Sequence, residues 1–373
     1  MKFIDRFISM KILFDARVLG GHMHGMARYC AGLLRQLLEG DQGIEYLVLI
    51  ADLKVRAWFN PTVPVRWIPT TIPLYSLQEQ ILLPRQIRGE SFDLFHSPTY
   101  TIPRVLAGKG ILTIHDLIPL LFPEDYGRKH RLFFRFVVRK AVARCLRVVT
   151  VSKHSSEDLL ARYPISGEKV VITPNGLDPH WRPRQRDSAF LEKQGLDNGY
   201  VLFVGNPKPH KNFNRVLAAF ERLLEEGGYP GNLAAVGVSL RELPPSLKGR
   251  VMIFPACNDQ DLALFYSGAD LLAAPSLYEG FGLPVLEAMA CGCPVLIGDR
   301  GALPEMAGEA GFQVNPYDIH AIKEGMQGLI SNPELRRSLK EKGLARAGDF
   351  SWEKTARIVL ETYRALGVGR VRP

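Results

Sequence analysis

Short apolar runs alternate with helical segments along the whole chain of 373 residues, and this alternation constrains the fold more than any other feature. Apolar runs bounded by turn residues are typical of strands buried on both faces of a sheet. Strands that alternate with helices form parallel sheets covered by helices. The first half predicts strands at residues 11–15, 46–50, 65–68, 94–96, 111–115, 148–152 and 170–173. The second half predicts strands at residues 200–205, 233–237, 251–254, 270–275, 295–297 and 312–314.

Residues 178–187 form a polar segment with proline and arginine, which is typical of a linker between domains. A chain of this length is sufficient for two domains of ordinary size. We therefore expect an α/β protein of two Rossmann-like, doubly wound domains, formed by residues 1–180 and 188–350. A last helix is expected over residues 352–373, with Ser351 as its N-cap.

Composition favours a globular protein of the cytoplasm. Five cysteines form an odd number without the spacing of a zinc site, which is typical of a reducing compartment. The chain is 46% hydrophobic and 23% charged, and no run approaches the roughly 20 apolar residues of a membrane-spanning helix. Residues 1–9 interleave charges with short apolar runs, so we expect no signal peptide there. We interpret them as an extension or as the product of an early start codon.

Part of the net charge of +9 is concentrated in residues 128–147, which contain eight Lys or Arg residues and no Asp or Glu. Arg131, Arg135 and Arg139 recur every four residues and should line one face of a helix. A basic amphipathic helix of this kind can bind the anionic cytoplasmic face of an inner membrane. It is equally typical of a solvated face in a basic protein, and both interpretations stay open. No nucleic-acid motif accompanies the charge, so we expect no nucleic-acid partner.

Residues 275–290 place two glutamates, Glu279 and Glu287, on either side of a glycine-containing turn that opens into a helix. Gly282 lets the backbone approach a ligand closely, and Pro284 suits the first helical turn. The free N–H groups of such a turn favour an anion, and ionised carboxylates accept hydrogen bonds from hydroxyl groups. The segment therefore predicts a site for a phosphate or a polar sugar. An ordinary strand–loop–helix corner with two solvated acids is the alternative.

The stretch from Glu279 to Glu287 resembles the E-x7-E motif of retaining glycosyltransferases of family 4, which have the GT-B fold. The similarity includes residues 261–270 upstream and continues through residues 288–295 and 301–308. It covers about the whole chain and is stronger in the second half. The resemblance implies two domains that face a central cleft, with the last helix crossing back to the first domain. Within the family, the chain resembles bacterial mannosyltransferases of surface-polysaccharide assembly.

The resemblance implies roles for residues of the second half. Glu287 would accept hydrogen bonds from the ribose of a nucleotide sugar, and Glu279 would bind hydroxyls of the donor sugar at the catalytic centre. Lys211 would offset the charge that grows on the leaving diphosphate. Many family members carry an arginine where this chain has Asn206, and the cation that replaces it is left open. Further donor contacts are expected from Phe281, Gly282, Leu283, Lys208 and Gly205.

Residues of the first half are expected to complete the site. Gly25, in a loop that enters a helix, resembles the glycine that lets a phosphate approach the backbone. His115 ends a predicted strand and, by resemblance, lies beside the donor sugar as a catalytic residue. His96 and Tyr100 follow another strand and are expected on the acceptor side. Without the resemblance, a histidine at a strand end is more typical of a structural role.

The resemblance implies transfer of a hexose, with mannose from GDP-mannose as the leading expectation, to a saccharide or lipid-linked saccharide in cell-surface polysaccharide or lipopolysaccharide biosynthesis. The sequence shows no metal-binding cluster, so we expect a metal-independent reaction without a cofactor. Two alternatives stay open: a sugar-nucleotide epimerase of the same fold, and a non-catalytic protein that binds sugar nucleotides. The G-x-G-x-x-G fingerprint is missing, which disfavours a nicotinamide dehydrogenase.

Overall fold

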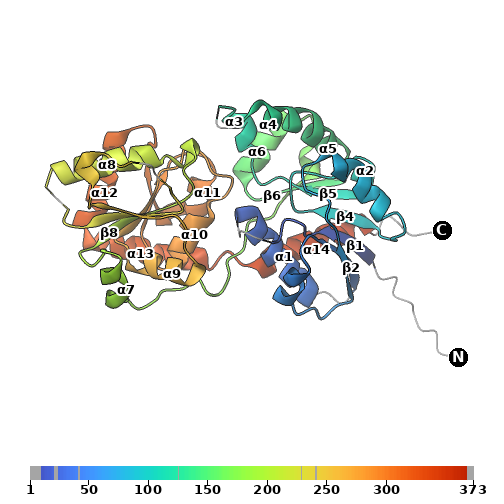
Figure 1. Ribbon diagram of the computed structural model, residues 1–373, viewed down its shortest axis with the longest axis horizontal. Coiled ribbons are helices and arrows are strands. Elements are labelled where there is room, and N and C mark those ends of the chain that lie inside the picture. Colours follow the sequence, from blue (N-terminus) through green and yellow to red (C-terminus); the bar gives the residue numbers. More distant parts are fainter. Residues whose placement is uncertain are drawn as a thin grey trace. The chain divides into compact units, whose positions relative to one another are not determined.

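The computed structural model describes residues 10–20, 24–40, 43–124, 126–227, 229–239 and 242–367 (Figure 1). Two compact units are present. The first comprises the chain up to Gly176 and the segment that begins at Ser351, and the second runs from Leu177 to Phe350. The expectations for residues 1–9 fall outside the described residues. Within the described ranges, no helix is long and apolar enough to cross a membrane.

The first unit is built on a parallel sheet with the strand order β3-β2-β1-β4-β5-β6-β7. Its strands are β1 (Met10–Asp15), β2 (Ile44–Ile50), β3 (Val65–Pro69), β4 (Leu94–Ser97), β5 (Gly110–Thr113), β6 (Arg147–Thr150) and β7 (Val170–Ile172). Its helices are α1 (Gly25–Gly40), α2 (Leu77–Gln86), α3 (Ile118–Leu121), α4 (Arg128–Phe133), α5 (Arg139–Arg144), α6 (Lys153–Arg162) and α14 (Trp352–Gly367). The strand order reverses between β1 and β4, which is where doubly wound sheets bind ligands.

The second unit repeats this architecture with the strand order β10-β9-β8-β11-β12-β13, again parallel throughout. Its strands are β8 (Tyr200–Val204), β9 (Asn232–Val236), β10 (Val251–Phe254), β11 (Leu271–Ala274), β12 (Val295–Gly298) and β13 (Gly311–Val314). Its helices are α7 (Ser188–Lys193), α8 (Phe213–Glu225), α9 (Asp259–Gly268), α10 (Leu283–Ala290), α11 (Leu303–Ala307), α12 (Ile319–Ser331) and α13 (Pro333–Ala347). The order reverses between β8 and β11, so the loops after these strands are the expected ligand edge.

The expected doubly wound α/β architecture is confirmed, and every predicted strand is present with ends that differ by at most two residues. The apolar runs succeed as predictors because both faces of each sheet are covered by helices. Leu13 and Leu112 lie in the core of the first unit, and Leu233 and Leu271 lie in the core of the second. Side chains at successive strand positions are therefore apolar on both faces.

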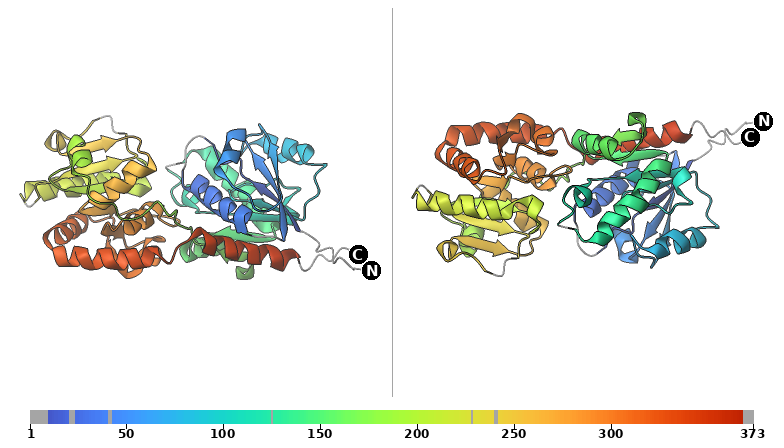
Figure 2. Two further views of the ribbon diagram at one scale, coloured as in Figure 1. Left: turned by 90° about the horizontal axis from the view of Figure 1, so that it is seen from below. Right: turned by 90° about the horizontal axis from the view of Figure 1, so that it is seen from above.

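The last helix, α14, packs against α1 in the first unit, and both views of Figure 2 show it running along this unit. The Trp352 indole lies so close to Gly32 that a Cβ at this glycine would clash with the ring. Tyr29 packs edge-on against the same indole, with ring centroids 6.2 Å apart. The Thr355 hydroxyl donates to the Pro174 carbonyl at 2.6 Å, which fixes the start of the helix.

Candidate functional site

Glu279 and Lys211 are in direct contact at the carboxyl edge of the second sheet. Lys211 Nζ lies 2.6 Å from Glu279 Oε1, and the Ser276 hydroxyl donates to the same oxygen at 2.8 Å. Lys211 ends the short 3-10 helix Pro209–Lys211 after β8, whereas Glu279 lies in the loop between β11 and α10. Their side chains are only 15% and 13% exposed. The expected phosphate-binding cation and sugar-binding acid thus form one largely buried ion pair.

A buried asparagine, to which sequence analysis assigned no role, fixes the loop after β8. Asn212 has a left-handed backbone with a φ of 65°. Its Nδ2 donates to the Pro275 carbonyl at 2.8 Å and to the Pro316 carbonyl at 2.6 Å. Leu277 N donates to the His210 carbonyl at 2.7 Å. These bonds join the loops after β8, β11 and β13. The sequence signal was available, because asparagine tolerates the left-handed region better than most residues.

The start of α10 leaves backbone donors open. Gly282 is the N-cap residue with a φ of 102°, Pro284 occupies the first turn, and no side chain caps the helix. Within the described ranges, the N–H groups of Phe281, Gly282 and Leu283 have no protein acceptor. The Phe281 ring is buried edge-on against Phe350, so this residue offers its backbone rather than its side chain. Such N–H groups bind an anion or a hydroxyl oxygen.

Glu287 is buried on α10, and a tyrosine from the neighbouring helix positions its carboxylate. The Tyr266 hydroxyl of α9 donates to Glu287 Oε2 at 3.1 Å. Burial, reinforced by this carboxylate, raises the pKa of Tyr266 well above its ordinary value, so the phenol remains a donor. The Trp181 ring packs edge-on against Tyr266, with centroids 5.8 Å apart. Sequence analysis assigned no role to Tyr266, because a contact between two helices is not visible in a local motif.

The other expected donor contacts lie in the loop after β8. Gly205 N donates to the Val236 carbonyl at 3.0 Å, which continues the pairing of β8 with β9. The Asn206 side chain accepts from Lys208 N at 3.2 Å in a local turn. A further cation lies nearby on α8, where Arg215 donates to Asn212 Oδ1 at 2.8 Å. Lys208 and Arg215 are therefore the cations closest in sequence to Lys211 at this edge.

His115 lies just beyond β5, at the carboxyl edge of the first sheet. Its Nε2 is 2.9 Å from the Pro98 carbonyl oxygen, so Nε2 carries the proton and Nδ1 is an acceptor. Burial lowers the pKa of His115 to about 4, so the ring is neutral at neutral pH. The Tyr29 ring packs edge-on at 4.8 Å between centroids and fixes the imidazole plane. A neutral imidazole in this state can accept a hydrogen bond from a sugar hydroxyl.

Tyr100 and Gly25 lie at the same edge of the first unit. The Tyr100 ring is 6.1 Å from the His115 ring and 5.3 Å from the Phe134 ring. Burial and the nearby Asp116 raise the pKa of Tyr100 well above its ordinary value, so its hydroxyl stays protonated. Gly25 is the exposed first residue of α1.

His96 does not lie on an acceptor surface, which corrects the expectation. Its side chain is fully buried, with Nδ1 2.5 Å from the Tyr363 hydroxyl of α14 and Nε2 3.3 Å from Thr113 Oγ1. Burial lowers the pKa of His96 to about 3. Side chains alternate between the two faces of a strand, so a position near the carboxyl end does not place a side chain at the edge. His96 instead fastens α14 to the sheet.

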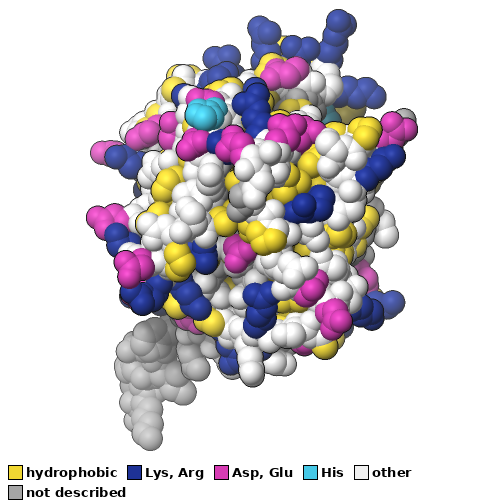
Figure 3. Space-filling model, turned by 90° about the vertical axis from the view of Figure 1, so that its left-hand side faces the viewer, with side chains coloured by type: hydrophobic (Ala, Val, Ile, Leu, Met, Phe, Trp, Pro, Cys, Tyr) yellow, Lys and Arg dark blue, Asp and Glu magenta, His cyan; other side chains and the backbone are white. Residues whose placement is uncertain are grey.

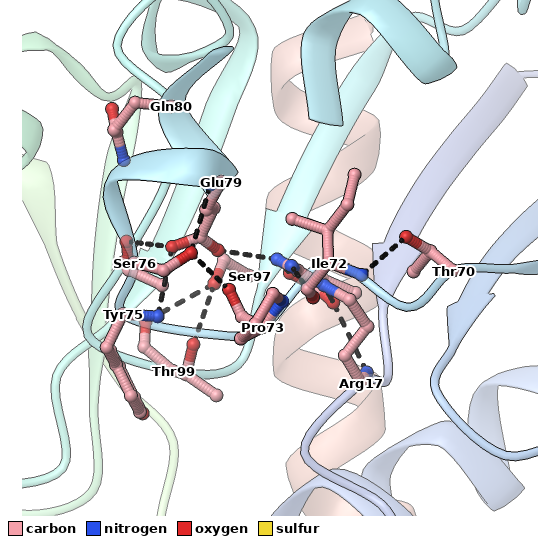
Figure 4. A network of polar contacts seen from close by, with 12 residues as sticks. Arg17, Thr70, Ile72, Pro73, Tyr75, Ser76, Glu79, Gln80, Ser97 and Thr99 are labelled. Carbon is pink, nitrogen blue, oxygen red and sulfur yellow. Dashed lines mark hydrogen bonds and ion pairs between the residues drawn. The ribbon is translucent and has the colours of Figure 1, made fainter. Parts of the chain in front are cut away.

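A buried ionic network at the carboxyl edge of the first sheet was not expected (Figure 4). Arg17 binds Asp15 through two bonds, from Nε to Oδ1 at 2.8 Å and from Nη2 to Oδ2 at 2.6 Å. The same Nη2 lies 2.5 Å from Glu79 Oε1. Burial raises the pKa of Glu79, although the Arg17 charge opposes this shift. The two carboxylates share one guanidinium, and 62 residues separate Arg17 from Glu79 in the chain.

One part of this network has a sequence signature. Ser76 and Glu79 have the spacing of a capping box, and the Ser76 hydroxyl accepts from Glu79 N at 3.1 Å. In a standard capping box the glutamate would accept from the serine N–H. Here Glu79 Oε2 accepts from Tyr75 N at 3.2 Å and from the Thr101 hydroxyl at 2.9 Å. The pattern predicts the helix start, but the partners of Glu79 depend on the fold.

Comparisons with known proteins agree with this architecture. A Glycosyltransferase Family 4 model matches residues 23–181, and a Glycosyl transferases group 1 model matches residues 186–346. The chain is 27% identical to O-antigen chain mannosyltransferase B of Escherichia coli, over 96% of this chain and 100% of that protein. It is 30% identical to O-antigen chain mannosyltransferase RfbU of Salmonella typhimurium, over 63% of this chain and 64% of that protein.

A solved structure of known fold agrees with the two-unit architecture of this chain. Sucrose-phosphate synthase from Thermosynechococcus elongatus superimposes with a TM-score of 0.76 at 21% identity, over 96% of this chain and 100% of that chain. The two family models occupy the two structural units in turn and together span most of the sequence. The chain therefore belongs to the glycosyltransferases of the GT-B fold, with a Glycosyltransferase Family 4 domain followed by a Glycosyl transferases group 1 domain.

Proposed function

We propose that the protein is a retaining hexosyltransferase that moves mannose from GDP-mannose to a saccharide or lipid-linked saccharide of a cell-surface polysaccharide or lipopolysaccharide. The observation that carries this proposal is the contact of Lys211 with Glu279, because it places a cation and a carboxylate where one ligand can meet both. The open N–H groups at the start of α10 add donors for a phosphate. The names of the two O-antigen mannosyltransferases support mannose and polysaccharide assembly.

Donor binding would exchange the partners of this ion pair. The diphosphate carries more negative charge than Glu279 and attracts the Lys211 ammonium, and the released Glu279 carboxylate accepts hydrogen bonds from sugar hydroxyls. The buried Glu287, oriented by Tyr266, accepts from the ribose. For His115 we propose a hydrogen bond from a sugar hydroxyl to its unprotonated Nδ1. The cation thus binds the diphosphate, and the hydrogen-bond acceptors bind the hydroxyl groups of the sugar and the ribose.

The proposed transfer needs no nucleophilic side chain. The acceptor hydroxyl attacks the anomeric carbon from the face on which the diphosphate departs, so the configuration is retained. The bond from the anomeric carbon to the diphosphate oxygen breaks, and the acceptor proton passes to a phosphate oxygen of the leaving group. Lys211 and the N–H groups of α10 stabilise the charge that develops on the diphosphate. We propose that no metal ion or cofactor takes part.

The test is a transfer reaction with purified protein, GDP-mannose and octyl α-D-mannopyranoside, with and without EDTA. We expect a disaccharide product in both cases, and proton NMR of its new anomeric signal should show the α configuration of the donor. Loss of transfer in EDTA would contradict metal independence, and a β product would contradict retention. Epimerisation of the donor alone would identify an epimerase. Binding of GDP-mannose without turnover would identify a binding protein.

We further propose that an exposed helical surface of the first unit binds anionic lipid. Residues 128–144 form one continuous helical segment, in which a π-helical turn, Phe134–Val138, joins α4 to α5. Its inner face, which includes Phe134 and Val138, packs into the core. Its outer face exposes every Arg and Lys of the segment, and with them Leu132 and Phe136, which are 53% and 52% exposed.

We call this outer face the basic stripe; its residues are Arg128, Lys129, Arg131, Leu132, Arg135, Phe136, Arg139, Lys140 and Arg144. In Figure 1, α4 and α5 lie at the surface of their unit. Over most of the face of the molecule in Figure 3, Lys and Arg side chains are mixed with Asp and Glu. Arginines bind lipid phosphates while Leu132 and Phe136 enter the apolar layer. A peripheral position on the cytoplasmic face of a membrane would bring the enzyme to a lipid-linked acceptor.

A further inference from the structure

Tyr75 has a backbone conformation that tyrosine rarely adopts. Its φ is 60°, and among the described residues only Tyr75 and Asn212 combine a side chain with a positive φ. This region is unfavourable for a bulky residue, and such conformations persist where the surrounding structure imposes them. Glycine would adopt this φ freely. The turn conformation would favour glycine, so it does not explain why the chain has a tyrosine at this position.

Buried charges fix the Tyr75 backbone (Figure 4). The Tyr75 N–H donates to Glu79 Oε2 at 3.2 Å, and Glu79 Oε1 is bound by Arg17, which in turn binds Asp15. The side chains of Asp15, Arg17 and Glu79 are at most 1% exposed. Removing one member of such a network leaves an uncompensated buried charge, so the network strongly favours one geometry. That geometry includes the left-handed turn at Tyr75.

The network joins the segments that follow three strands at the carboxyl edge of the first sheet, and Glu79 lies in the first turn of α2. Arg17 follows β1, Thr101 follows β4, and Tyr75 and Glu79 follow β3. Arg17 Nη1 also donates to the Ile72 carbonyl at 3.0 Å. Strands β1 and β4 are the neighbours at which the strand order reverses. Tyr75 is thus anchored to the edge at which doubly wound sheets bind ligands.

The Tyr75 ring points away from the ion pair of Arg17 and Glu79 (Figure 4). It packs edge-on against Phe133 with centroids 5.8 Å apart, and its hydroxyl lies 3.8 Å from Met26 Sδ. The residue nevertheless remains 41% exposed. A rigid, partly exposed tyrosine ring offers an apolar surface. A pyranose has the matching chemistry, because its C–H face is apolar.

We propose that Tyr75 is the platform on which the acceptor pyranose packs, and that Arg17 and Glu79 are positioning residues that set its backbone. This inference rests on the proposed glycosyl transfer and names the residues that recognise the acceptor. Tyr75 belongs to the first unit, whereas Lys211, Glu279 and the α10 N–H groups belong to the second. Acceptor and donor binding should therefore respond to different substitutions.

The decisive variant is Tyr75→Gly, because glycine suits the observed φ and removes the ring. We expect its melting temperature to equal or exceed that of the wild type, since the backbone strain is relieved. Its KM for octyl α-D-mannopyranoside should rise by about 10-fold or more through loss of the aromatic contact. Its KM for GDP-mannose should not change. Tyr75→Phe should keep most of the acceptor affinity, and Trp58→Ala, which removes another partly exposed ring of the first unit, should leave both constants unchanged.

Glu79→Gln tests the positioning role. Glutamine can still accept from the Tyr75 N–H but leaves the Arg17 charge with one carboxylate fewer. We expect a higher acceptor KM with an unchanged donor KM, and the double variant Glu79→Gln/Tyr75→Gly should have no higher acceptor KM than Tyr75→Gly alone. If Tyr75→Gly melts well below the wild type, or transfers with wild-type acceptor KM, the inference is wrong. Absence of transfer and of GDP-mannose binding in the wild type would instead overturn the proposed function, and this inference with it.

Discussion

The Lys211 ammonium and the Glu279 carboxylate lie 2.6 Å apart although 68 residues separate them in the chain. Ser276 donates to the same carboxylate oxygen, so Glu279 Oε1 already has two donors before any ligand binds. A diphosphate that binds Lys211 must therefore compete with Glu279. This competition couples phosphate binding to release of the carboxylate that we propose for the sugar. We therefore propose that the ion pair is the resting arrangement of the donor site.

Replacement of Lys211 should affect turnover more than donor binding. Lys211→Ala removes the charge that stabilises the leaving diphosphate, and we expect kcat to fall by about 100-fold or more, as for loss of one preorganised donor to a developing charge. Lys208→Ala, a change of the same size in the same loop, should have a smaller effect. Steady-state kinetics of transfer from GDP-mannose give kcat for both variants. Wild-type turnover in Lys211→Ala would remove the proposed role.

Replacement of Glu287 should weaken donor binding. Glu287→Ala removes the proposed acceptor for the ribose hydroxyls, and loss of hydrogen bonds to a charged group corresponds to about a 10-fold to 100-fold rise in Kd. Calorimetric titration with GDP measures this. Tyr266→Phe keeps the carboxylate but removes its 3.1 Å hydrogen bond, so we expect a smaller effect. Unchanged GDP affinity in a folded Glu287→Ala protein would count against the ribose assignment.

The basic stripe should be required for binding to anionic vesicles. Changing Arg131, Arg135 and Arg139 to Glu should abolish sedimentation with phosphatidylglycerol vesicles, because each basic residue near an anionic surface contributes about 1 kcal/mol. The matched control changes three other exposed basic residues of the first unit, Lys54, Arg56 and Arg88, to Glu. It carries the same change in net charge. Equal binding by both triple variants would show that the stripe is a solvated face.

Changing Leu132 and Phe136 to Ser separates apolar insertion from charge attraction. This variant keeps every arginine of the stripe, so we expect initial binding at low salt but weaker binding at 0.5 M salt, where charges are screened. Vesicle sedimentation at the two salt concentrations measures the difference. Unchanged binding at high salt would show that these two side chains do not enter the bilayer.

The strands and the site loop were predictable because short segments of the sequence specify them. Strand positions follow from apolar runs that both faces of a sheet require, and the E-x7-E segment carries its own turn residues. The partners of the site residues were not predictable in the same way. Tyr266 on α9 donates to Glu287 on the neighbouring helix α10, and Arg17 binds Glu79, which lies 62 residues away in the sequence. Such contacts depend on how elements pack, which no single segment specifies.

The error at His96 has a simple physical origin. Both His96 and His115 stand near strand ends, but His96 lies within β4 and points into the core, whereas His115 lies beyond β5. A shift of one residue along a strand moves a side chain to the other face. Sequence analysis placed the strand correctly but did not resolve which side chain leaves the sheet.

The buried His96 should make the stability of the first unit depend on pH. Its pKa falls from about 6.5 in the unfolded chain to about 3 in the fold, because burial disfavours the charged ring. As the pH falls below 6.5, the unfolded state binds a proton that the folded state does not. The free energy of unfolding should therefore decrease by about 1.4 kcal/mol per pH unit for this group, and this continues down to the folded pKa. Burial lowers the pKa of His115 to about 4, so this residue acts in the same direction in the first unit. Burial also lowers the pKa of His210 to about 4, so the second unit should lose stability in the same pH range.

Urea denaturation at pH 7 and pH 5, followed by far-ultraviolet circular dichroism, measures this dependence. His96→Gln should be less stable than the wild type at pH 7, because it alters the hydrogen bonds to Tyr363 and Thr113. It should nevertheless lose less stability between pH 7 and pH 5, because glutamine does not titrate. His320→Gln, a change at an exposed histidine of α12, should keep the full dependence. If His96→Gln also kept the full pH dependence, the His96 imidazole of the wild type would have to be protonated in the folded protein. Its hydrogen bond to the Tyr363 hydroxyl would then need a different explanation.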